Sequence, residues 1–444
     1  MGEWLTYIRA VRRLAAGVIL ACGLAGGASS ALAGPAAQDV LITWNRMVLE
    51  LVRHTPTYSP PVASRAFAYL GVTAFEATVG GSETLTSLAG QLNALEPVPG
   101  RETGEGYDEA VVMHTAMAHA VRHFFSNTGP TGQRAMTMLE TRMGAQVAAG
   151  VPEEVVARST AYGRAVATHI IAWSVDDGGA VVENLGFPAA FALGEGRDRW
   201  VPTSSIPLQQ TPLLPEWGKN RTFAMPAGSS CPLPPPPEYS EAPGSDFYAE
   251  ALEVYNVANS LDAEQEAIAR FWSDDPMLSP TPPGHWLSIA IQILEHENAT
   301  LDESVDLLAR LGVVLADAFI GCWDAKYEFD LVRPVTYIGR LIDADWKPIL
   351  ITPPFPEYPS GHSTQSGAAA AVLEAHFGAD FAFTDATHEG DGLPARTYAS
   401  FWEAAEEAAI SRLYGGIHYR AAIERGLDQG LCIADFTAAL ETRR

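Results

Sequence analysis

Apolar residues recur at the spacing of amphipathic helices through most of this chain, whereas the alternating pattern of a half-buried strand is rare. In the first part of the chain this spacing predicts helices over residues 37–53, 62–78, 107–125, 134–149 and 153–175. It returns later and predicts helices over residues 247–260, 263–272, 285–298, 301–332, 364–377, 398–413 and 418–440. The sequence therefore predicts an all-α fold.

Residues 176–245 interrupt the helical pattern with turn residues and prolines. They include most of CPLPPPPEYSEAPGSD, beginning at Cys231, which neither a helix nor a central strand accommodates because proline lacks the backbone donor. We interpret residues 176–245 as a proline-rich connector between one helical bundle over residues 34–175 and a second over residues 246–444. The expected architecture is two packed bundles of helices.

The start of the chain has the pattern of an export signal. Three arginines between residues 9 and 13 precede an apolar run over residues 14–24, and Ala31-Leu32-Ala33 forms a small-x-small cleavage pattern. This predicts a signal peptide over residues 1–33 and a secreted or periplasmic protein. The apolar run is short and glycine-rich for a membrane anchor, and no other segment is long and apolar enough to span a bilayer.

Charge and cysteine content restrict the partners of this chain. The formal net charge of -25 argues against nucleic acid or an acidic membrane, because an anionic surface repels phosphate groups. Any anion site must therefore be local. After residue 33 only Cys231, Cys322 and Cys432 remain, which allows at most one disulfide plus a free thiol and no thiolate metal motif.

The segment KYEFDLVRP places two cations, Lys326 and Arg333, seven residues apart. Seven steps of a helix return to within about 20° of the start, so both side chains are expected on one helical face, about 10 Å apart. Pro334 disfavours a helical conformation at Arg333 and is expected to end the helix there. Two such cations can converge on one small anion, and a solvated basic edge is the simpler alternative.

The segment FPEYPSGHSTQSG, beginning at Phe355, leads from prolines into a helix of small residues. Pro359 fixes the backbone, Gly361 lets the chain approach a ligand closely, and the free N–H groups of a helix start favour an anion. Ser360 adds a hydroxyl donor and His362 a titratable one. An ordinary capped helix with a surface histidine would show the same pattern.

The segment SRLYGGIHYR carries Arg412 at the end of one predicted helix and His418 at the start of the next. Gly415 and Gly416 break the two helices, so both side chains can face one cavity across the break. A planar guanidinium suits a tetrahedral oxyanion, and a neutral imidazole can act as a ligand or a nucleophile. Together the three segments predict one anion site in the C-terminal bundle.

The three segments fall in a fixed order. Six residues separate Lys326 from Arg333-Pro334, and 24 more lead to Pro359-Ser360-Gly361-His362. A further 48 residues lead to Ser411-Arg412, and five more to His418. The pattern covers about a hundred residues and resembles the tripartite signature shared by vanadium-dependent haloperoxidases and the type 2 phosphatidic acid phosphatase superfamily. The segments WDAKYEFDLVRP and PPFPEYPSGH are similar to the chloroperoxidase-like branch of the haloperoxidases.

The resemblance implies a two-bundle helical fold and a vanadate cofactor in the C-terminal bundle. The residues implied to bind the vanadate oxygens are Lys326, Arg333, Ser360, Gly361 and Arg412. His418 would be the axial vanadium ligand and His362 the acid–base group beside the apical oxygen, while Lys326 would also polarise bound peroxide. Trp323 and Phe355 would line the halide side of the pocket. Asp274 would be the carboxylate that orients Arg412.

One position departs from the family pattern, which often places an aspartate four residues after the histidine ligand. This sequence has Ala422 at that position. In a phosphatase of the superfamily, the aspartate would orient His418 and hold its tautomer.

The resemblance implies a vanadium-dependent haloperoxidase, which oxidises halide with hydrogen peroxide to hypohalous acid through a histidine-bound peroxovanadate and halogenates a small organic acceptor. The alternative is a secreted acid phosphatase in which His418 forms a phosphohistidine and His362 protonates the leaving alcohol. Trp323, Phe355 and the export signal favour the haloperoxidase. A binding protein without turnover is disfavoured by the complete set of anion-site residues. Whether the protein is a homo-oligomer is left open by the sequence.

Overall fold

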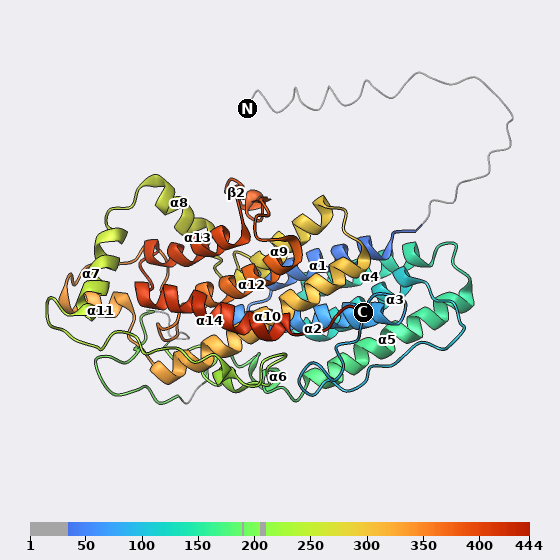
Figure 1. Cartoon of the computed structure of the whole chain (residues 1–444), viewed down its shortest axis with the longest axis horizontal. Helices are drawn as coiled ribbons and strands as arrows, with labels where there is room; N and C mark the ends of the chain where they lie inside the picture. Colours follow the sequence, from blue (N-terminus) through green and yellow to red (C-terminus); the bar gives the residue numbers. More distant parts are fainter. Residues whose placement is uncertain (1–33, 189–190, 205–209) are drawn as a thin grey trace, which may run out of the picture. The chain divides into compact units, whose positions relative to one another are not determined.

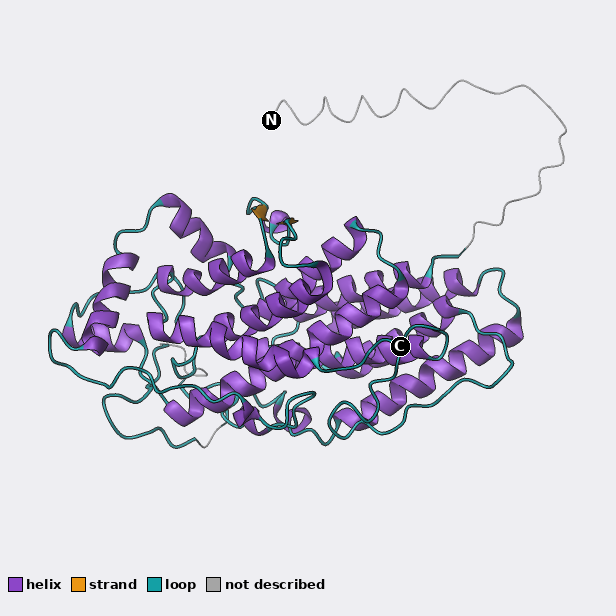
Figure 2. Ribbon diagram, viewed as in Figure 1, coloured by secondary structure: helices purple, strands orange, loops and turns teal. Residues whose placement is uncertain are grey.

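The computed structural model describes residues 34–188, 191–204 and 210–444. Most of these residues are helical, and the predicted all-α fold is confirmed (Figure 1, Figure 2). The predicted signal peptide, residues 1–33, lies outside the described residues and stays a prediction. Within the described ranges, no helix combines the length and the apolar character needed to cross a bilayer.

The helices before the connector follow the predicted ones closely. They are α1 (Ala37–Arg53), α2 (Pro60–Val79), α3 (Glu109–Phe124), α4 (Pro130–Ala148) and α5 (Glu153–Ser174). Helices α2 and α4 begin with proline. The first N–H groups of a helix have no partner within it, so proline, which has no N–H, is tolerated there. The predicted interruption is observed, since the described part of residues 176–245 contains only the short turns α6 (Gly179–Val182), η2 (Trp217–Lys219) and η3 (Gly228–Ser230).

The second helical region comprises α7 (Asp246–Ala258), α8 (Ala263–Phe271), α9 (Thr281–His296), α10 (Leu301–Phe329), α11 (Pro334–Leu341), α12 (Gly361–Phe377), α13 (Phe401–Tyr414) and α14 (Arg420–Ala438). Side chains of Asp262, Thr300 and Ser400 accept backbone N–H groups at the starts of α8, α10 and α13. The predictions of these helices came from their apolar spacing, and the caps fix where they begin.

A short antiparallel hairpin of β1 (Phe383–Asp385) and β2 (Arg396–Tyr398) lies between α12 and α13, with the 3-10 turn η4 (Glu389–Asp391) in its loop. In its register Phe383 is paired with Tyr398, and both are buried. The hairpin was not predicted from the sequence. Strands of three residues are too short to show an alternating pattern.

Helices α2 and α10 pack along one another, and residues from both halves of the chain share one hydrophobic core. A Cβ at Gly71 would lie 2.7 Å from the carbonyl oxygen of Leu308, and one at Gly312 would lie 2.8 Å from that of Phe67. Glycine is therefore required where the two helices touch. Residues 34–444 form one compact unit, and the predicted boundaries of two bundles and a connector stay a prediction.

The end of α10 differs from the prediction. The helix ends at Phe329, because Asp330 adopts a left-handed conformation with φ 48° and ψ 41°. Arg333 is extended, with φ -76° and ψ 152°, before Pro334 begins α11. Lys326 and Arg333 therefore do not share a helical face, and their predicted helical spacing is wrong. Arg333 reaches the site from the start of α11 instead.

A disulfide joins Cys231, which follows η3, to Cys432 in α14. It connects two segments 201 residues apart in the sequence. Cys322 is buried in α10 and is free. One disulfide and one free thiol agree with the prediction from the three cysteines that follow residue 33.

Candidate functional site

The second and third sequence segments meet at one cavity of about 530 Å³. Gly361 and His362 reach it from the start of α12, and Arg412 reaches it from the last turn of α13. His418 lies between α13 and α14, beyond a turn in which Gly416 has φ 76°, a conformation that glycine adopts without strain. The expected convergence of Arg412 and His418 across the glycine break is therefore observed.

Arg333 brings the first segment to the same place. Its Nε donates to the carbonyl of Phe355 at 2.9 Å, and its Nη1 donates to the carbonyl of Ile417 at 2.8 Å. The same Nη1 lies 3.1 Å from Nε2 of His418. Nη2 is buried and has no hydrogen-bond partner among the described residues. The guanidinium thus keeps both N–H groups of Nη2 for a group that would enter beside His418.

The imidazole of His418 is held by a carboxylate from an earlier segment. Its Nδ1 lies 2.8 Å from Oε1 of Glu357, and the same oxygen accepts the backbone N–H of Tyr419 at 2.8 Å. Because Oε1 already accepts from the backbone, Nδ1 is the donor of the pair, and Nε2 keeps its lone pair. Glu357 therefore supplies the carboxylate that Ala422 does not. Ala422 contributes its carbonyl, which accepts the N–H of Ser360 at 2.9 Å.

Burial keeps this imidazole uncharged. It lowers the pKa of His418 well below its usual range, and the neighbouring cations Arg333 and Lys326 lower it further. Burial also raises the pKa of Glu357 to about 8, although Arg333 opposes the shift. A neutral imidazole with an unprotonated Nε2 is the form that can ligate a metal or attack phosphorus.

Lys326 lies in the last turn of α10 and is fully buried. Its Nζ donates to the carbonyls of Pro356 and Glu357, each at 3.0 Å, and to the carbonyl of Pro359. These bonds use all three ammonium donors and fix the turn that leads into α12. Burial lowers the pKa of Lys326 to about 7. In this structure the residue positions the chain before Ser360 rather than presenting a free donor.

The start of α12 carries the motif that the sequence singled out. Oγ of Ser360 accepts the N–H of Ser363 at 3.3 Å, so Ser360 is the N-cap of this helix. Nε2 of His362 is buried and finds no partner in the part of the chain that the structure describes. Burial lowers the pKa of His362 well below its usual range, and the charge of Arg412 lowers it further. An uncharged, unpaired imidazole nitrogen is therefore available at the cavity.

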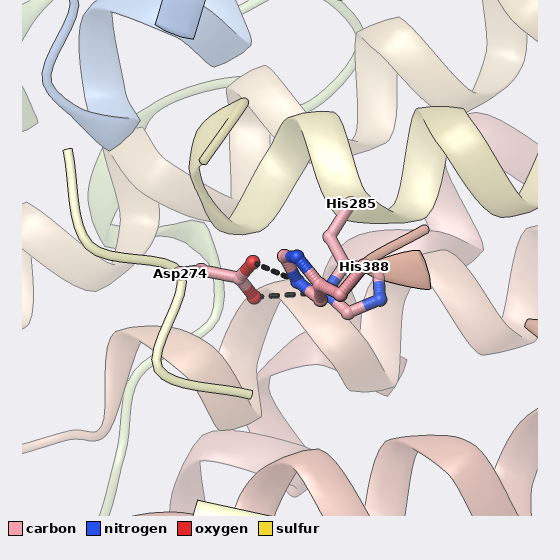
Figure 3. Close-up of side chains that lie close together, drawn as sticks. All are labelled: Asp274, His285 and His388. Carbon is pink, nitrogen blue, oxygen red and sulfur yellow. Dashed lines mark hydrogen bonds and ion pairs between the residues drawn. The ribbon is translucent and has the colours of Figure 1, made fainter. Parts of the chain in front are cut away.

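Arg412 is held by a carbonyl rather than by the predicted carboxylate. Its Nη1 donates to the carbonyl of Trp272 at 2.6 Å, and its Nε is buried without a partner in the described structure. The two oxygens of Asp274 instead bind His285 at 2.9 Å and His388 at 3.1 Å (Figure 3). Among the described hydrogen bonds, the predicted contact between Asp274 and Arg412 is not formed.

Trp323 and Phe355 form an aromatic wall of the cavity. Their ring centroids lie 4.9 Å apart. The Phe355 centroid is also 5.1 Å from Nζ of Lys326 and 5.0 Å from Cζ of Arg333. A Cβ at Gly361 would make ordinary van der Waals contact, with the ring of Trp323 nearest at 3.8 Å. The predicted halide side is thus an aromatic surface close to two cations.

The residues at the cavity fit a vanadate ion. An oxyanion of this shape needs several N–H donors, and its metal needs a nitrogen lone pair. The buried nitrogens without partners among the described residues include Nη2 of Arg333, Nε of Arg412 and Nε2 of His362. His418 offers the lone pair on Nε2. Phosphate has the same shape and charge, so the donor set fits that ion as well.

The outer part of the cavity is apolar. Leu185, Met277, Leu278 and Ile351 line it, although 63, 47, 71 and 74% of their surfaces are exposed. Single exposed apolar residues are common, but four around one cavity mark a surface for an apolar molecule. The cavity also falls within the range of about 300–1,000 Å³ that is usual for small-molecule sites.

Glu357 is the site residue that the sequence motifs did not reveal. It stands three residues before Ser360, inside the motif itself, yet its partner His418 lies 61 residues away. His285 and His388 were missed for the same reason, since both meet Asp274 only in the folded chain. The one local signal was an acidic residue among the prolines before Ser360.

Comparisons with known proteins match the part of the chain that carries these motifs. A family model described as the VCPO second helical-bundle domain matches residues 306–443. The curated vanadium chloroperoxidase of Curvularia inaequalis is 26% identical over 217 residues, covering 35% of this chain and 36% of that protein. The match therefore spans little more than a third of the curated relative's length.

Solved structures resemble nearly the whole chain. The crystal structure described as the first bacterial vanadium-dependent iodoperoxidase is 37% identical and has a TM-score of 0.82, covering 91% of this chain and 97% of that one. A holo-type bacterial vanadium-dependent chloroperoxidase is 16% identical with a TM-score of 0.67, covering 92% and 93%. This second likeness is one of fold alone. Both likenesses extend through the two helical regions.

Proposed function

The chain belongs to the vanadium-dependent haloperoxidases, and we propose that it oxidises a halide with hydrogen peroxide to hypohalous acid. The proposal rests on the neutral imidazole of His418, whose Nε2 lone pair lies beside Arg333 and at the cavity shared with His362 and Arg412. Arg333 and Arg412 would hold the oxygens of vanadate, and His418 would bind the metal. When bound, vanadate supplies a Lewis-acidic centre that activates peroxide without changing its own oxidation state.

His362 is the group proposed to move protons. Its imidazole is neutral, so its unpaired Nε2 can accept a proton from entering peroxide and donate it later to a leaving oxygen. Ser360 and Gly361 are proposed as further donors at the start of α12. Lys326 fixes the turn before them, and the direct bond to peroxide that the resemblance implies would replace one of its three carbonyl bonds.

The halide is proposed to approach along Trp323 and Phe355. Aromatic ring edges carry partial positive charge, and Arg333 and the protonated form of Lys326 add positive charge close to Phe355. A small polarisable anion is therefore attracted to this wall. The similar solved structure described as an iodoperoxidase makes iodide the first halide to test.

A small organic acceptor is proposed to occupy the outer, apolar part of the cavity. Leu278 and Ile351 border that part and expose most of their surfaces. An apolar aromatic molecule would cover these side chains and lie next to the place where oxidised halide forms. The acceptor class proposed is therefore an electron-rich aromatic compound rather than a charged one.

We also propose that the protein works outside the cytoplasm. The Cys231–Cys432 disulfide is of a kind that forms and persists in oxidising compartments. The predicted signal peptide over residues 1–33 supports the same location. Fractionation of cells that produce the full-length chain tests this, and a protein confined to the cytoplasm would contradict it.

One purified protein in two assays tests the activity. With orthovanadate, peroxide and iodide or bromide, the protein should form triiodide or brominate a phenol, and the His418→Ala variant should not. Without vanadium, hydrolysis of a phosphate ester is measured in parallel. Phosphate-ester turnover without vanadate-dependent halide oxidation would show that the alternative phosphatase activity is the correct one.

A further inference from the structure

Asp274, His285 and His388 form a buried cluster beside the anion site (Figure 3). Nδ1 of His285 lies 2.9 Å from Oδ2 of Asp274, and its Nε2 lies 2.7 Å from Oδ2 of Asp385. His388 is placed in the same way, with Nε2 at 3.1 Å from Asp274 and Nδ1 at 3.0 Å from Asp391. Both nitrogens of both rings therefore face carboxylate oxygens.

This arrangement fixes the protons of the cluster. A neutral imidazole has one donor and one acceptor nitrogen, whereas an ionised carboxylate only accepts, so a ring between two carboxylates is satisfied as an imidazolium. The ring of Trp272 stacks on His285 at 4.4 Å and 23°, as a ring does over a cation. Arg53 completes the charges with bonds to Asp391 at 2.6 and 2.8 Å. Three carboxylates then face three cations, namely Asp274, Asp385 and Asp391 opposite His285, His388 and Arg53.

The cluster holds a segment with strained backbone. Asp274, Met277 and Thr281 have φ of 48°, 70° and 67°, which non-glycine residues rarely adopt. Asp274 and Met277 lie between α8 and α9, and Thr281 is the first residue of α9. The bonds of His285 tie this connection to the hairpin strand β1, because Asp385 is the last residue of that strand. Strain of this kind persists where surrounding contacts over-determine the backbone.

The held segment touches the anion site directly. The carbonyl of Trp272 accepts Nη1 of Arg412 at 2.6 Å. Trp272 is in turn stacked on His285. A displacement of this segment would therefore move the acceptor that aims the guanidinium of Arg412.

We propose that His285, clamped between Asp274 and Asp385, is a positioning residue that holds the Trp272 carbonyl and thereby aims Arg412 at the oxyanion. The inference rests on the proposed function only in that the oxyanion is taken to be vanadate. It assigns His285 no contact with substrate. Its effect passes through Arg412.

The test measures binding of orthovanadate to the vanadate-free protein by equilibrium dialysis, with inorganic phosphate as a second probe. His285→Gln should weaken orthovanadate binding by about tenfold, because the amide replaces only one of two charged bonds. His114→Gln is the matched control, since His114 is also buried but bonds only Trp44 Nε1 among the described hydrogen bonds. The control should lose stability and keep its affinity.

A double variant separates positioning from general damage. On an Arg412→Ala background, His285→Gln should change the orthovanadate dissociation constant by less than about twofold, because the residue acts through Arg412. Additive losses in the double variant would overturn the proposal, as would an unchanged affinity in His285→Gln alone. Restored affinity in His285→Lys, which keeps a buried cation, would support it.

Two further outcomes are distinguishable. One equivalent of a divalent metal that wild type binds and His285→Gln does not bind would show that Asp274, His285 and His388 form a metal site. That result would overturn the positioning role of His285. If wild type binds orthovanadate or phosphate but oxidises no halide, the proposed function is overturned and the positioning role of His285 is not. Wild type that binds neither anion would overturn both.

Discussion

Oε1 of Glu357 lies 2.8 Å from Nδ1 of His418 and fixes which nitrogen of that ring carries the proton. The pair connects the motif before α12 to the turn before α14. Its consequence is that Nε2 of His418 faces Arg333 with a lone pair rather than a proton. The strength of any bond from His418 to a metal should therefore depend on Glu357.

Glu357→Gln tests this dependence. An amide can present either its oxygen or its N–H to Nδ1, so it no longer fixes the proton there, and vanadate affinity is expected to fall by about 10- to 100-fold. Titration of the vanadate-free protein with orthovanadate measures the change. Glu76→Gln is the matched control, because Glu76 is a buried glutamate that bonds the N–H of Leu88 in the N-terminal half. Equal affinities in both variants would contradict the assignment.

Phe355→Leu tests the aromatic wall. Loss of a ring about 5 Å from two cations should raise KM for iodide by about two- to fivefold, the ratio equivalent to a weak cation–π contact. In this variant the dissociation constant for vanadate should change by a smaller factor than the KM for iodide. Steady-state triiodide formation at varied iodide gives the value, and Phe377→Leu, which packs on Phe381 and Phe401, is the control. An unaltered KM would remove Phe355 from the halide path.

Leu278→Ser and Ile351→Ser test the acceptor surface. Both side chains are more than two-thirds exposed, at 71 and 74%, so neither variant should lose much stability. KM for an apolar phenol should rise, whereas triiodide formation without an acceptor should be unaffected. Met138→Ser, 72% exposed and absent from the residues lining the cavity, is the matched control. Unchanged KM values in both rim variants would show that oxidised halide reacts away from the cavity.

The buried cluster predicts a loss of stability at alkaline pH. Burial alone would lower the pKa of His285, but the charges of Asp274 and Asp385 outweigh it and raise that pKa to about 10. A histidine with a raised folded-state pKa contributes its full stabilisation below its unfolded-state value of about 6.5 and loses it as pH approaches about 10. The midpoint of thermal unfolding should fall across this window.

Asp385→Asn provides the comparison for this prediction. It removes one of the two charges that raise the pKa of His285, so the alkaline loss should begin at a lower pH than in wild type. Thermal unfolding followed by circular dichroism from pH 6 to pH 10 measures both proteins. Superimposable pH profiles would mean that His285 is not the titrating group.

Reduction of the Cys231–Cys432 disulfide should destabilise the protein. The bond closes a long loop, and loops of this length gain up to about 5 kcal/mol from a cross-link. Calorimetry with and without reductant, and on Cys432→Ser, should show a lower midpoint of unfolding in both cases. Cys322→Ser, which leaves the disulfide in place, should retain sensitivity to reductant. An unfolding midpoint that reductant does not change in wild type would contradict the Cys231–Cys432 pairing.

Most of the helices were predictable because burial of an apolar face leaves its period in the sequence, although α2 is buried on nearly every side and α11 was not predicted. Their ends were less predictable where tertiary contacts decide. Asp330 ends α10 in a left-handed conformation, which aspartate adopts more readily than most residues, but the apolar spacing continued past it. The β1–β2 hairpin is stabilised by packing of Phe383 and Tyr398 rather than by a long alternating pattern.

The cations of the site were predictable because they stand at helix ends beside proline and glycine. Which carboxylate pairs with which base was not predictable. Asp274 was expected to orient Arg412, yet its oxygens bind His285 and His388. These pairings join segments separated by tens of residues or more. The sequence around a carboxylate does not indicate which base it will contact.

The contact between α2 and α10 restricts how this enzyme can be divided. The match of the family model begins within α10, at residue 306, but Gly312 in that helix lies against the backbone of Phe67 in α2. A fragment that begins there would leave that apolar strip bare and should aggregate. Chimaeras between relatives should therefore exchange α2 and α10 together, so that both helices of this contact come from the same parent protein.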